Sequence, residues 1–218
     1  MPTNSRGPND RNGGDPMSRT PLVGIDHLTL LQVSPPELIT ITRETGFDAV
    51  GLRVGTSSNF TAERLAQALQ VSQRYGSVRY ESLHPLYNLV EREEFEGGLQ
   101  QVCIEQGLGV IPYFSLARGF LSGKYRPNQK LPESPRAQGV QKLYMNERGF
   151  AILEVVDRVA AKYNTKPTQV SLAWLMAQPG ITAPISSGTS PEQVGELMQT
   201  IELKLRDEDL EALTNAGK

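Results

Sequence analysis

Short apolar runs alternate with amphipathic stretches along most of this 218-residue chain, and this alternation limits its fold more than any other feature. Five runs have the length and composition of buried strands, at 22–31, 48–54, 79–83, 109–113 and 181–185. Helical patterns lie between and after them, at 34–46, 59–75, 93–106, 147–163, 168–177, 190 onward and 205–210. Strands and helices that alternate in this way are typical of a parallel sheet. We therefore predict an α/β fold built from parallel (βα) units.

Two stretches interrupt this pattern. Residues 1–20 are rich in Gly, Pro, Asn, Asp, Ser and Arg, which predicts a disordered tail. Residues 123–146 are polar, with prolines at 127, 132 and 135, and predict a long loop that is either a lid over a ligand or a surface insertion. An eight-stranded (βα) barrel typically has about 250 residues, which is more than the 218 residues of this chain. Because we also find only five predicted strands, we predict an incomplete barrel in a single domain over 21–218.

Charge and composition limit the partners of the chain. The formal charge of −2 and the hydrophobic content of 38% predict neither a nucleic-acid partner nor a membrane partner. No apolar run approaches the roughly 20 residues of a membrane-spanning helix, so we expect a cytoplasmic protein. With two histidines and one cysteine, we expect no metal site. Cys103 lies in a helical apolar pattern, which favours a buried thiol over a nucleophile.

Small polar side chains gather where the predicted strands end. They follow four strands, at Thr56–Asn59, His84–Asn88, Tyr113–Ser115 and Ser186–Ser190. In each loop they could simply cap the next helix. However, ligands of parallel (βα) proteins bind beyond the carboxyl ends of the strands, and hydroxyls, amides and helix N-termini suit a phosphate or a carboxamide. Four such loops in register therefore favour a ligand-binding face.

The same loops carry a family resemblance. The segments Ser57–Phe60, Tyr80–Leu89, Tyr113–Tyr125 and Pro184–Gln193 resemble, in order and spacing, the cofactor-binding half of the aldo-keto reductase family. The resemblance extends from about residue 55 to the C-terminus. It implies TIM-barrel-type parallel (βα) units, an NADP(H) cofactor and the reduction of aldehydes or ketones.

The resemblance also implies roles for individual residues at the nicotinamide end. Ser58 and Asn59 would hydrogen-bond the nicotinamide carboxamide, and the Tyr113 ring would stack on the nicotinamide face. His84 stands where the family usually has a glutamine that also binds the carboxamide. A neutral imidazole has one donor and lacks the paired donor and acceptor of an amide.

Further residues would bind the rest of the cofactor. By resemblance they are Ser115, Leu116 and Gly119 at the pyrophosphate, Ser186, Gly188 and Thr189 near the adenosine 2′-phosphate, and Gln193 and Glu196 beside the adenine. There is no Arg or Lys between residues 184 and 193. A 2′-phosphate would therefore rely on neutral donors and a helix dipole, which leaves NAD(H) as an alternative to NADP(H).

The catalytic residues of the family are not evident. The family's catalytic acid, a Tyr–Lys pair with an Asp and a His, lies in its first strands, whereas this chain has no lysine before Lys124 and no tyrosine before Tyr75. The tetrad is therefore missing by resemblance, and whether the chain is an active enzyme stays open. Carbonyl reduction requires a proton donor, for which His84 and Tyr87 are the candidates.

The first part of the chain resembles a different family. Gly24–Leu30 and Thr45–Leu52 look like the opening (βα) unit of sugar-phosphate isomerase barrels related to xylose isomerase. We therefore expect an incomplete or chimeric barrel, which a natural fusion, a gene remnant or an engineered recombination would explain. Two alternatives to a reductase follow: a non-catalytic nucleotide-binding or self-associating scaffold, paired as a homodimer through open sheet edges, and an isomerase-like enzyme.

Overall fold

The computed structural model describes residues 24–26, 49–51, 61–75, 79–188 and 190–218. The chain divides into two compact units, Met1–Leu52 and Arg53–Lys218. In the first unit, strand β1 (Gly24–Asp26) pairs in parallel with β2 (Ala49–Gly51). Both strands lie within the runs predicted to be strands. The predicted tail and the predicted helix at 34–46 lie outside the described residues.

The second unit contains a small parallel sheet. Strand β3 (Ser82–Leu83) pairs with β4 (Gly109–Val110), and a bridge between Leu86 and Tyr113 continues the pairing. The predicted strand at 181–185 forms a single bridge, from Ile181 to Val110. The mixed α/β fold with parallel strands is therefore confirmed. Among the described residues these strands form small open sheets, and closure into a barrel is not seen.

Two helices accompany this sheet, α2 (Ala62–Tyr75) and α3 (Gly98–Gln106). The prediction for α2 is confirmed apart from its first residues, which are not described. Helix α3 ends as predicted, at Gly107, whose φ of 62° favours glycine. Its predicted start at residue 93 is wrong. The N–H of Phe95 instead bonds to the carbonyl of Arg92 in a turn, which places the buried Phe95 ring in the core.

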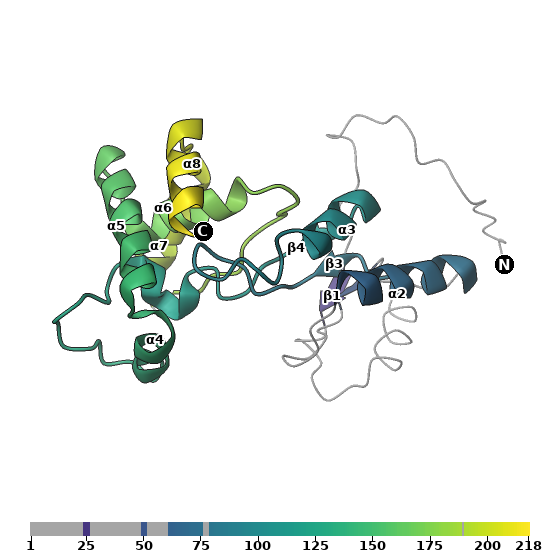
Figure 1. The fold of residues 1–218 in the computed structure, drawn as a ribbon, viewed down its shortest axis with the longest axis horizontal. Coiled ribbons are helices and arrows are strands. Elements are labelled where there is room, and N and C mark those ends of the chain that lie inside the picture. The colour runs from purple at the N-terminus through teal and green to yellow at the C-terminus, as the bar shows by residue number, and fades with distance from the viewer. Residues whose placement is uncertain (1–23, 27–48, 52–60, 76–78, 189) are drawn as a thin grey trace. The chain divides into compact units, whose positions relative to one another are not determined.

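The remaining helices lie between residues 117 and 218 and pack together (Figure 1). They are the 3₁₀ helix η3 (Ala117–Ser122), α4 (Ala137–Tyr144), α5 (Glu147–Lys162), α6 (Pro167–Met176), α7 (Pro191–Gln199), the 3₁₀ helix η4 (Thr200–Glu202) and α8 (Asp207–Ala216). Helices α5 and α6 match their predictions within about one residue, and α7 begins within one residue of its predicted start. Helix α8 runs six residues further than predicted, and α4 lies in a segment predicted to be a loop.

Helix α4 corrects the prediction of a structureless loop at 123–146. Val140 and Tyr144 are one turn apart on the helix and both are buried, with the Tyr144 ring stacked on Phe120 of η3 at 5.8 Å. Burial of side chains of this size contributes about 1.5–3 kcal/mol each. This free energy stabilises a helix that the local sequence pattern did not predict. The segment is therefore partly folded against the core and is not a free surface insertion.

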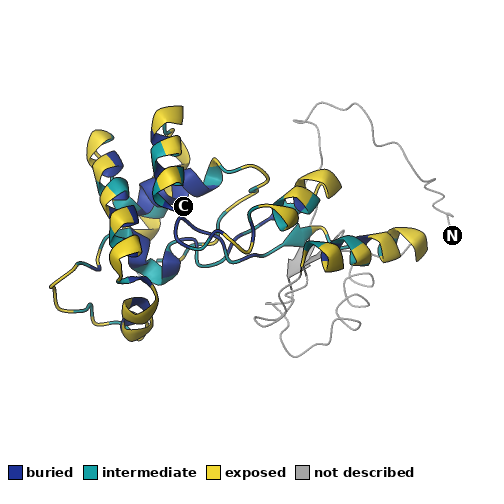
Figure 2. Cartoon of the chain, viewed as in Figure 1, coloured by how far each residue is buried: buried dark blue, intermediate teal, exposed yellow. Residues whose placement is uncertain are grey.

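A large part of the core of the second unit lies between α5, α6 and α8. Helix α5 buries one stripe, including Ile152, Val156 and Val159, and exposes the opposite one (Figure 2). Asn146 caps this helix by accepting a hydrogen bond from the N–H of Gly149 at 2.8 Å. Helix α6 is buried along most of its length, with Trp174 fully enclosed. In the described part of the chain, no helix is both long and apolar enough to cross a membrane.

Candidate functional site

Three of the four polar strand ends converge at one edge of the sheet. The N–H of Tyr113 donates to the carbonyl of Pro85 at 3.0 Å, and the N–H of Ile185 donates to the carbonyl of Pro112 at 3.0 Å. The loops that begin near His84, Tyr113 and Ser186 therefore leave neighbouring parallel segments on the same side. The fourth loop, with Ser58 and Asn59, lies outside the described residues.

The two candidate proton donors after β3 occupy different environments. His84 is half-buried, and its Nε2 lies 3.5 Å from the hydroxyl of Ser82. Tyr87 is 0% exposed and packs on Phe95 and Trp174. Its hydroxyl donates to Glu96 at 2.8 Å, and burial together with this carboxylate raises the pKa of Tyr87 well above its usual range. Tyr87 therefore faces the core, and its phenol is a weak acid.

Asn88 connects the loop after β3 to the loop after β4. Its side-chain amide donates to the carbonyl of Phe114 and to the carboxylate of Glu91, both at 3.0 Å. Its side-chain oxygen accepts the N–H groups of Val90 at 2.9 Å and of Glu91 at 3.0 Å. Glu91 also accepts the hydroxyl proton of Tyr144 at 2.8 Å, so helix α4 joins the same network. Because Asn88 is 0% exposed, these bonds hold the two loops together without competition from water.

The loop after β4 has an unusual backbone. Phe114, Ala117 and Arg118 have φ values of 52°, 47° and 57°, a region that side chains rarely adopt, and Gly119 has a φ of 96°. Strained residues of this kind cluster at ligand clamps and active sites. The hydroxyl of the buried Ser115 donates to the carbonyl of Pro112 at 3.2 Å, so it stabilises this loop.

Two cations lie at this loop, Arg118 within it and Lys124 after it, and no role was predicted for either from the sequence. The guanidinium of Arg118 lies 4.1 Å above the Phe114 ring. The side chain of Lys124 crosses Gly119 so closely that a Cβ there would lie 3.3 Å from Lys124 Cε and 3.4 Å from Nζ. Within the described residues, neither cation forms a salt bridge. The signal that could have revealed them was a basic residue on either side of Gly119.

The loop before α7 approaches the N-terminus of that helix. A Cβ on Gly188 would lie 2.9 Å from the Cβ of Gln193 and 3.0 Å from the N of Val194, so only glycine fits without displacement. Ser190 caps the helix by accepting from the N–H of Gln193. Glu196 is paired with Lys166, the residue before α6. Of the predicted adenine-end residues, Ser186 is half-buried, Gln193 is exposed and Thr189 is not described.

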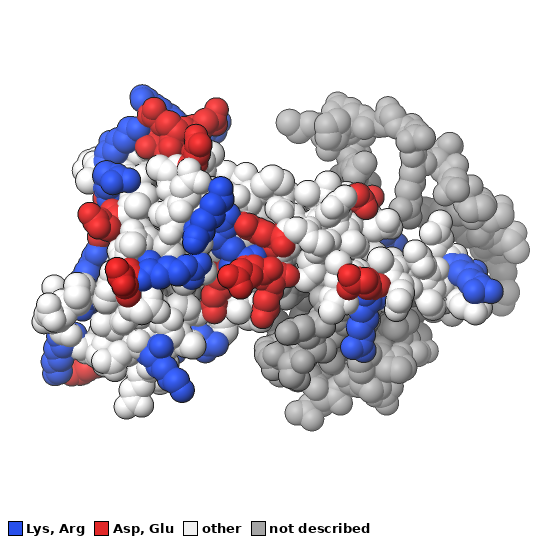
Figure 3. Space-filling model, in the orientation of Figure 1, with Lys and Arg blue, Asp and Glu red and all other residues white. Residues whose placement is uncertain are grey.

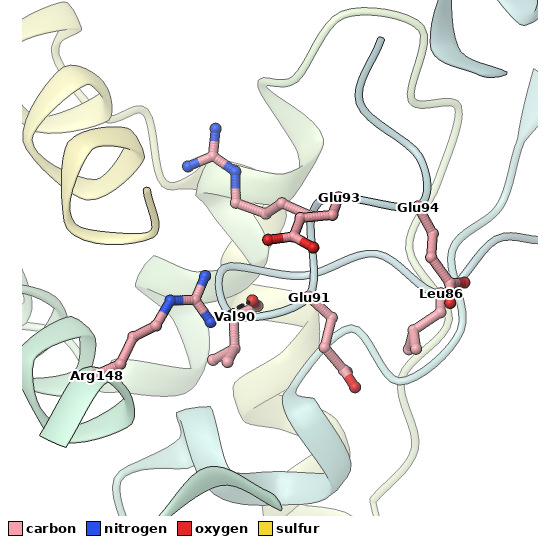
Figure 4. Close-up of a pocket in the computed structure, with 7 residues that line it drawn as sticks. Leu86, Val90, Glu91, Glu93, Glu94 and Arg148 are labelled. Atoms are coloured by element: carbon pink, nitrogen blue, oxygen red, sulfur yellow. Dashed lines mark hydrogen bonds between the residues drawn. The ribbon is translucent and has the colours of Figure 1, made fainter. Parts of the chain in front are cut away.

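A pocket of about 250 Å³ lies beside the loop that follows β3. It is lined by Leu86, Val90, Glu91, Arg92, Glu93, Glu94 and Arg148, and Figure 4 shows Arg148 reaching from α5 toward Val90. Acidic and basic side chains lie close together on the face drawn in Figure 3. The described residues contain no cluster of three or more His, Cys, Asp or Glu side chains that could hold a metal ion.

Comparison with known proteins identifies the family. The model of the Aldo/keto reductase family matches residues 52–218, which is most of the chain. The chain belongs to this family. The match begins after β2, so the resemblance of the first unit to isomerase barrels receives no support from it.

Several curated relatives of the chain are oxidoreductases by name. The NADP(+) aldo-keto reductase yakc of Schizosaccharomyces pombe is 30% identical over 130 residues, which are 58% of this chain and 38% of the relative. The versiconal hemiacetal acetate reductase of Aspergillus parasiticus is 28% identical, over 67% and 43%. The L-glyceraldehyde 3-phosphate reductase of Escherichia coli is 24% identical, over 69% and 44%. The chain thus spans less than half the length of these relatives.

Proposed function

We propose that this aldo-keto reductase family chain binds NADP(H) and reduces aldehydes or ketones. The observation that carries the proposal is the strained loop 113–119, at the edge where three parallel strand ends meet, with Arg118 within it and Lys124 beside it. Close backbone approach at a glycine and two nearby cations suit a pyrophosphate. The name of one relative, the NADP(+) aldo-keto reductase yakc, supports a nicotinamide cofactor.

Each residue of the proposed site has a defined task. Tyr113 would stack on the nicotinamide, Leu116 and Gly119 would lie against the pyrophosphate, and Lys124 would neutralise its charge. The cofactor, when bound, supplies a hydride to the carbonyl carbon. We propose His84 as the donor that protonates the carbonyl oxygen, because Tyr87 faces the core.

The choice between NADP(H) and NAD(H) depends on the loop before α7. Ser186, Gly188 and the N-terminus of α7 offer neutral donors and a positive helix end to a 2′-phosphate. We propose NADP(H) on this basis. Tighter binding of NADH than of NADPH by the pure protein would assign NAD(H) instead.

A calorimetric titration with NADPH tests the cofactor site. Tyr113→Ala and Lys124→Ala should each weaken binding by about five- to tenfold, because each removes a contact worth about 1 kcal/mol. Tyr75→Ala and Lys130→Ala are matched controls, since these side chains are 68% and 88% exposed and belong to other segments than the loop 113–119. Equal effects of site and control variants would refute the assignment of this loop.

A second substitution separates binding from catalysis. His84→Gln keeps hydrogen-bonding groups for a carboxamide and removes the proton donor. We expect turnover of an aldehyde to fall while the affinity for NADPH is retained. Unchanged turnover would exclude His84 as the donor.

A self-associating scaffold is the alternative that a specific observation favours. Val194, Met198 and Ile201 lie on one side of α7 and η4 and are 47%, 60% and 65% exposed, and α7 buries no residue. We propose that such surfaces, with the open sheet edges, pair two copies of the chain. Sedimentation velocity tests this proposal, and a monomer at all concentrations would rule it out.

The isomerase-like alternative has its own test. If the pure protein shows isomerase activity that requires a divalent metal, the reductase proposal is refuted.

A further inference from the structure

Helix α8 is attached at both of its ends by charged side chains from other elements. At its first turn, Lys162 donates to both oxygens of Asp209 at 2.9 Å, and Tyr163 donates to the same carboxylate at 2.7 Å. At its last turn, Arg92 donates to the carbonyl of Thr214, and Arg148 donates to the carbonyl of Gly217 at 2.7 Å. The first attachment leads to the end of α5, whereas the second leads both to the start of α5 and to the loop after β3.

Arg92 is held rigidly at this second attachment. It is only 7% exposed, forms a two-point ion pair with Glu96 at 2.7 and 2.9 Å, and lies 5.4 Å from the Trp174 ring. The indole N–H of Trp174 in turn donates to the hydroxyl of Thr214 at 2.9 Å. A guanidinium at a helix C-terminus also interacts favourably with the negative end of the helix dipole.

Gly217 and Arg148 bring the end of α8 against segment 88–92. A Cβ on Gly217 would lie 2.5 Å from the carbonyl oxygen of Leu89 and 3.0 Å from a guanidinium nitrogen of Arg92, so the backbones are in close contact. Arg148 donates with one nitrogen to Gly217 and with the other to the carbonyl of Val90 at 3.0 Å, in the region drawn in Figure 4. A planar guanidinium can bridge two carbonyls in this way.

Segment 88–92 continues this connection to the loop after β4. Val90 donates its N–H to Asn88, and Asn88 donates to the carbonyl of Phe114, whose φ of 52° begins the strained loop. A strained backbone persists only where its surroundings over-determine it. We propose that Arg148 is a positioning residue for the cofactor loop: by joining Gly217 to Val90 it holds segment 88–92, and through Asn88 the loop 113–119, in the binding conformation. This inference rests on the proposed cofactor site.

The two attachments of α8 supply a matched test on the full chain. Arg148→Met releases the end of α8 next to segment 88–92, and Asp209→Asn weakens its start. Both should lower the urea midpoint of unfolding. Only Arg148→Met should speed hydrogen exchange of the amides at 113–119 and weaken NADPH binding, by about three- to thirtyfold. Arg148→Lys should fall between wild type and Arg148→Met, because an ammonium does not reproduce the planar two-carbonyl bridge.

The readouts separate the possible outcomes. Unchanged exchange at 113–119 in Arg148→Met, with faster exchange confined to α8, would overturn the positioning role. Faster exchange at 113–119 in a chain that binds no NADPH even as wild type would support the role and refute the cofactor proposal. If Arg148→Met does not fold, Gly217→Ala makes the same test, because its added methyl group displaces the end of α8 from Leu89. Exchange at 113–119 that matches wild type in folded Gly217→Ala would contradict the inference.

Discussion

The α carbon of Gly149 faces the carbonyl oxygen of Tyr144 so closely that no Cβ fits between them. The contact lies at the junction where α4 ends and α5 begins, and Phe120 of η3 would lie 3.2 Å from the same Cβ. A glycine inside a helix usually weakens it. Here it allows two consecutive helices to meet over the core.

Gly149 and Gly139 form a pair for mutation, because both lie inside helices and only one is crowded. Gly149→Ala should lower the free energy of unfolding by about 1 to 3 kcal/mol, since the methyl group forces the backbone of Tyr144 to move. Gly139→Ala should raise it by about 0.5 to 1 kcal/mol, because nothing lies within 4 Å of a Cβ at Gly139. Urea unfolding of the two variants measures both effects. Similar changes would contradict the close contact at Gly149.

Removal of the Asn88 side chain should be among the most destabilising polar substitutions in the second unit. Asn88→Ala leaves the partly buried carbonyl of Phe114 and the buried N–H of Val90 without these partners. We expect a loss of about 2 to 4 kcal/mol in the free energy of unfolding. Gln101→Ala is the control, since this exposed side chain bonds to Glu105 on the surface of the same helix. Equal unfolding midpoints for the two variants would argue against the network.

The thiol of Cys103 should react slowly. The side chain is 0% exposed, and burial raises the pKa of the thiol to about 11. Since the thiolate is the reactive form, alkylation by iodoacetamide at pH 8 should be at least about tenfold slower in the folded chain than in urea. Mass spectrometry of timed samples measures the two rates. Fast labelling without denaturant would place Cys103 at the surface.

Asp209 should make the stability of the chain depend on pH in acid. Burial alone would raise the pKa of its carboxyl, but hydrogen bonds from Lys162 and Tyr163 and the positive charge of Lys162 hold this pKa below its ordinary value. The ionised form is therefore favoured by folding. Its contribution is complete above the unfolded pKa and disappears as pH falls through the lower folded pKa.

Comparison of wild type with Asp209→Asn over a pH series measures this contribution. The difference in unfolding free energy should stay constant from about pH 7 to 5 and shrink below about pH 4. The expected difference at neutral pH is about 1.5 to 3 kcal/mol, because hydrogen bonds to a charged group are lost. A difference that grows in acid would mean that the pKa shift has the opposite sign.

Local patterns were sufficient for much of the fold. The helical pattern at 147–163 predicted α5, and the pattern that begins at Ser190 and Pro191 predicted the start of α7. Capping and the spacing of apolar residues act over three or four positions, so they can be read directly along the chain. The loops at the strand ends were also predictable, because parallel strands bring their carboxyl ends to one edge.

Other features depended on partners distant in the sequence. Helix α4 forms because Tyr144 packs on Phe120 and bonds to Glu91, and Tyr87 turns inward because Phe95, Glu96 and Trp174 enclose it. The amino-acid sequence by itself thus determined the α/β class, most helix positions and the three loops of the candidate site. Only the tertiary structure decided which side chains those loops expose and how α8 holds them. Burial and buried hydrogen bonds are energies of contact between segments, and local periodicity contains no information about them.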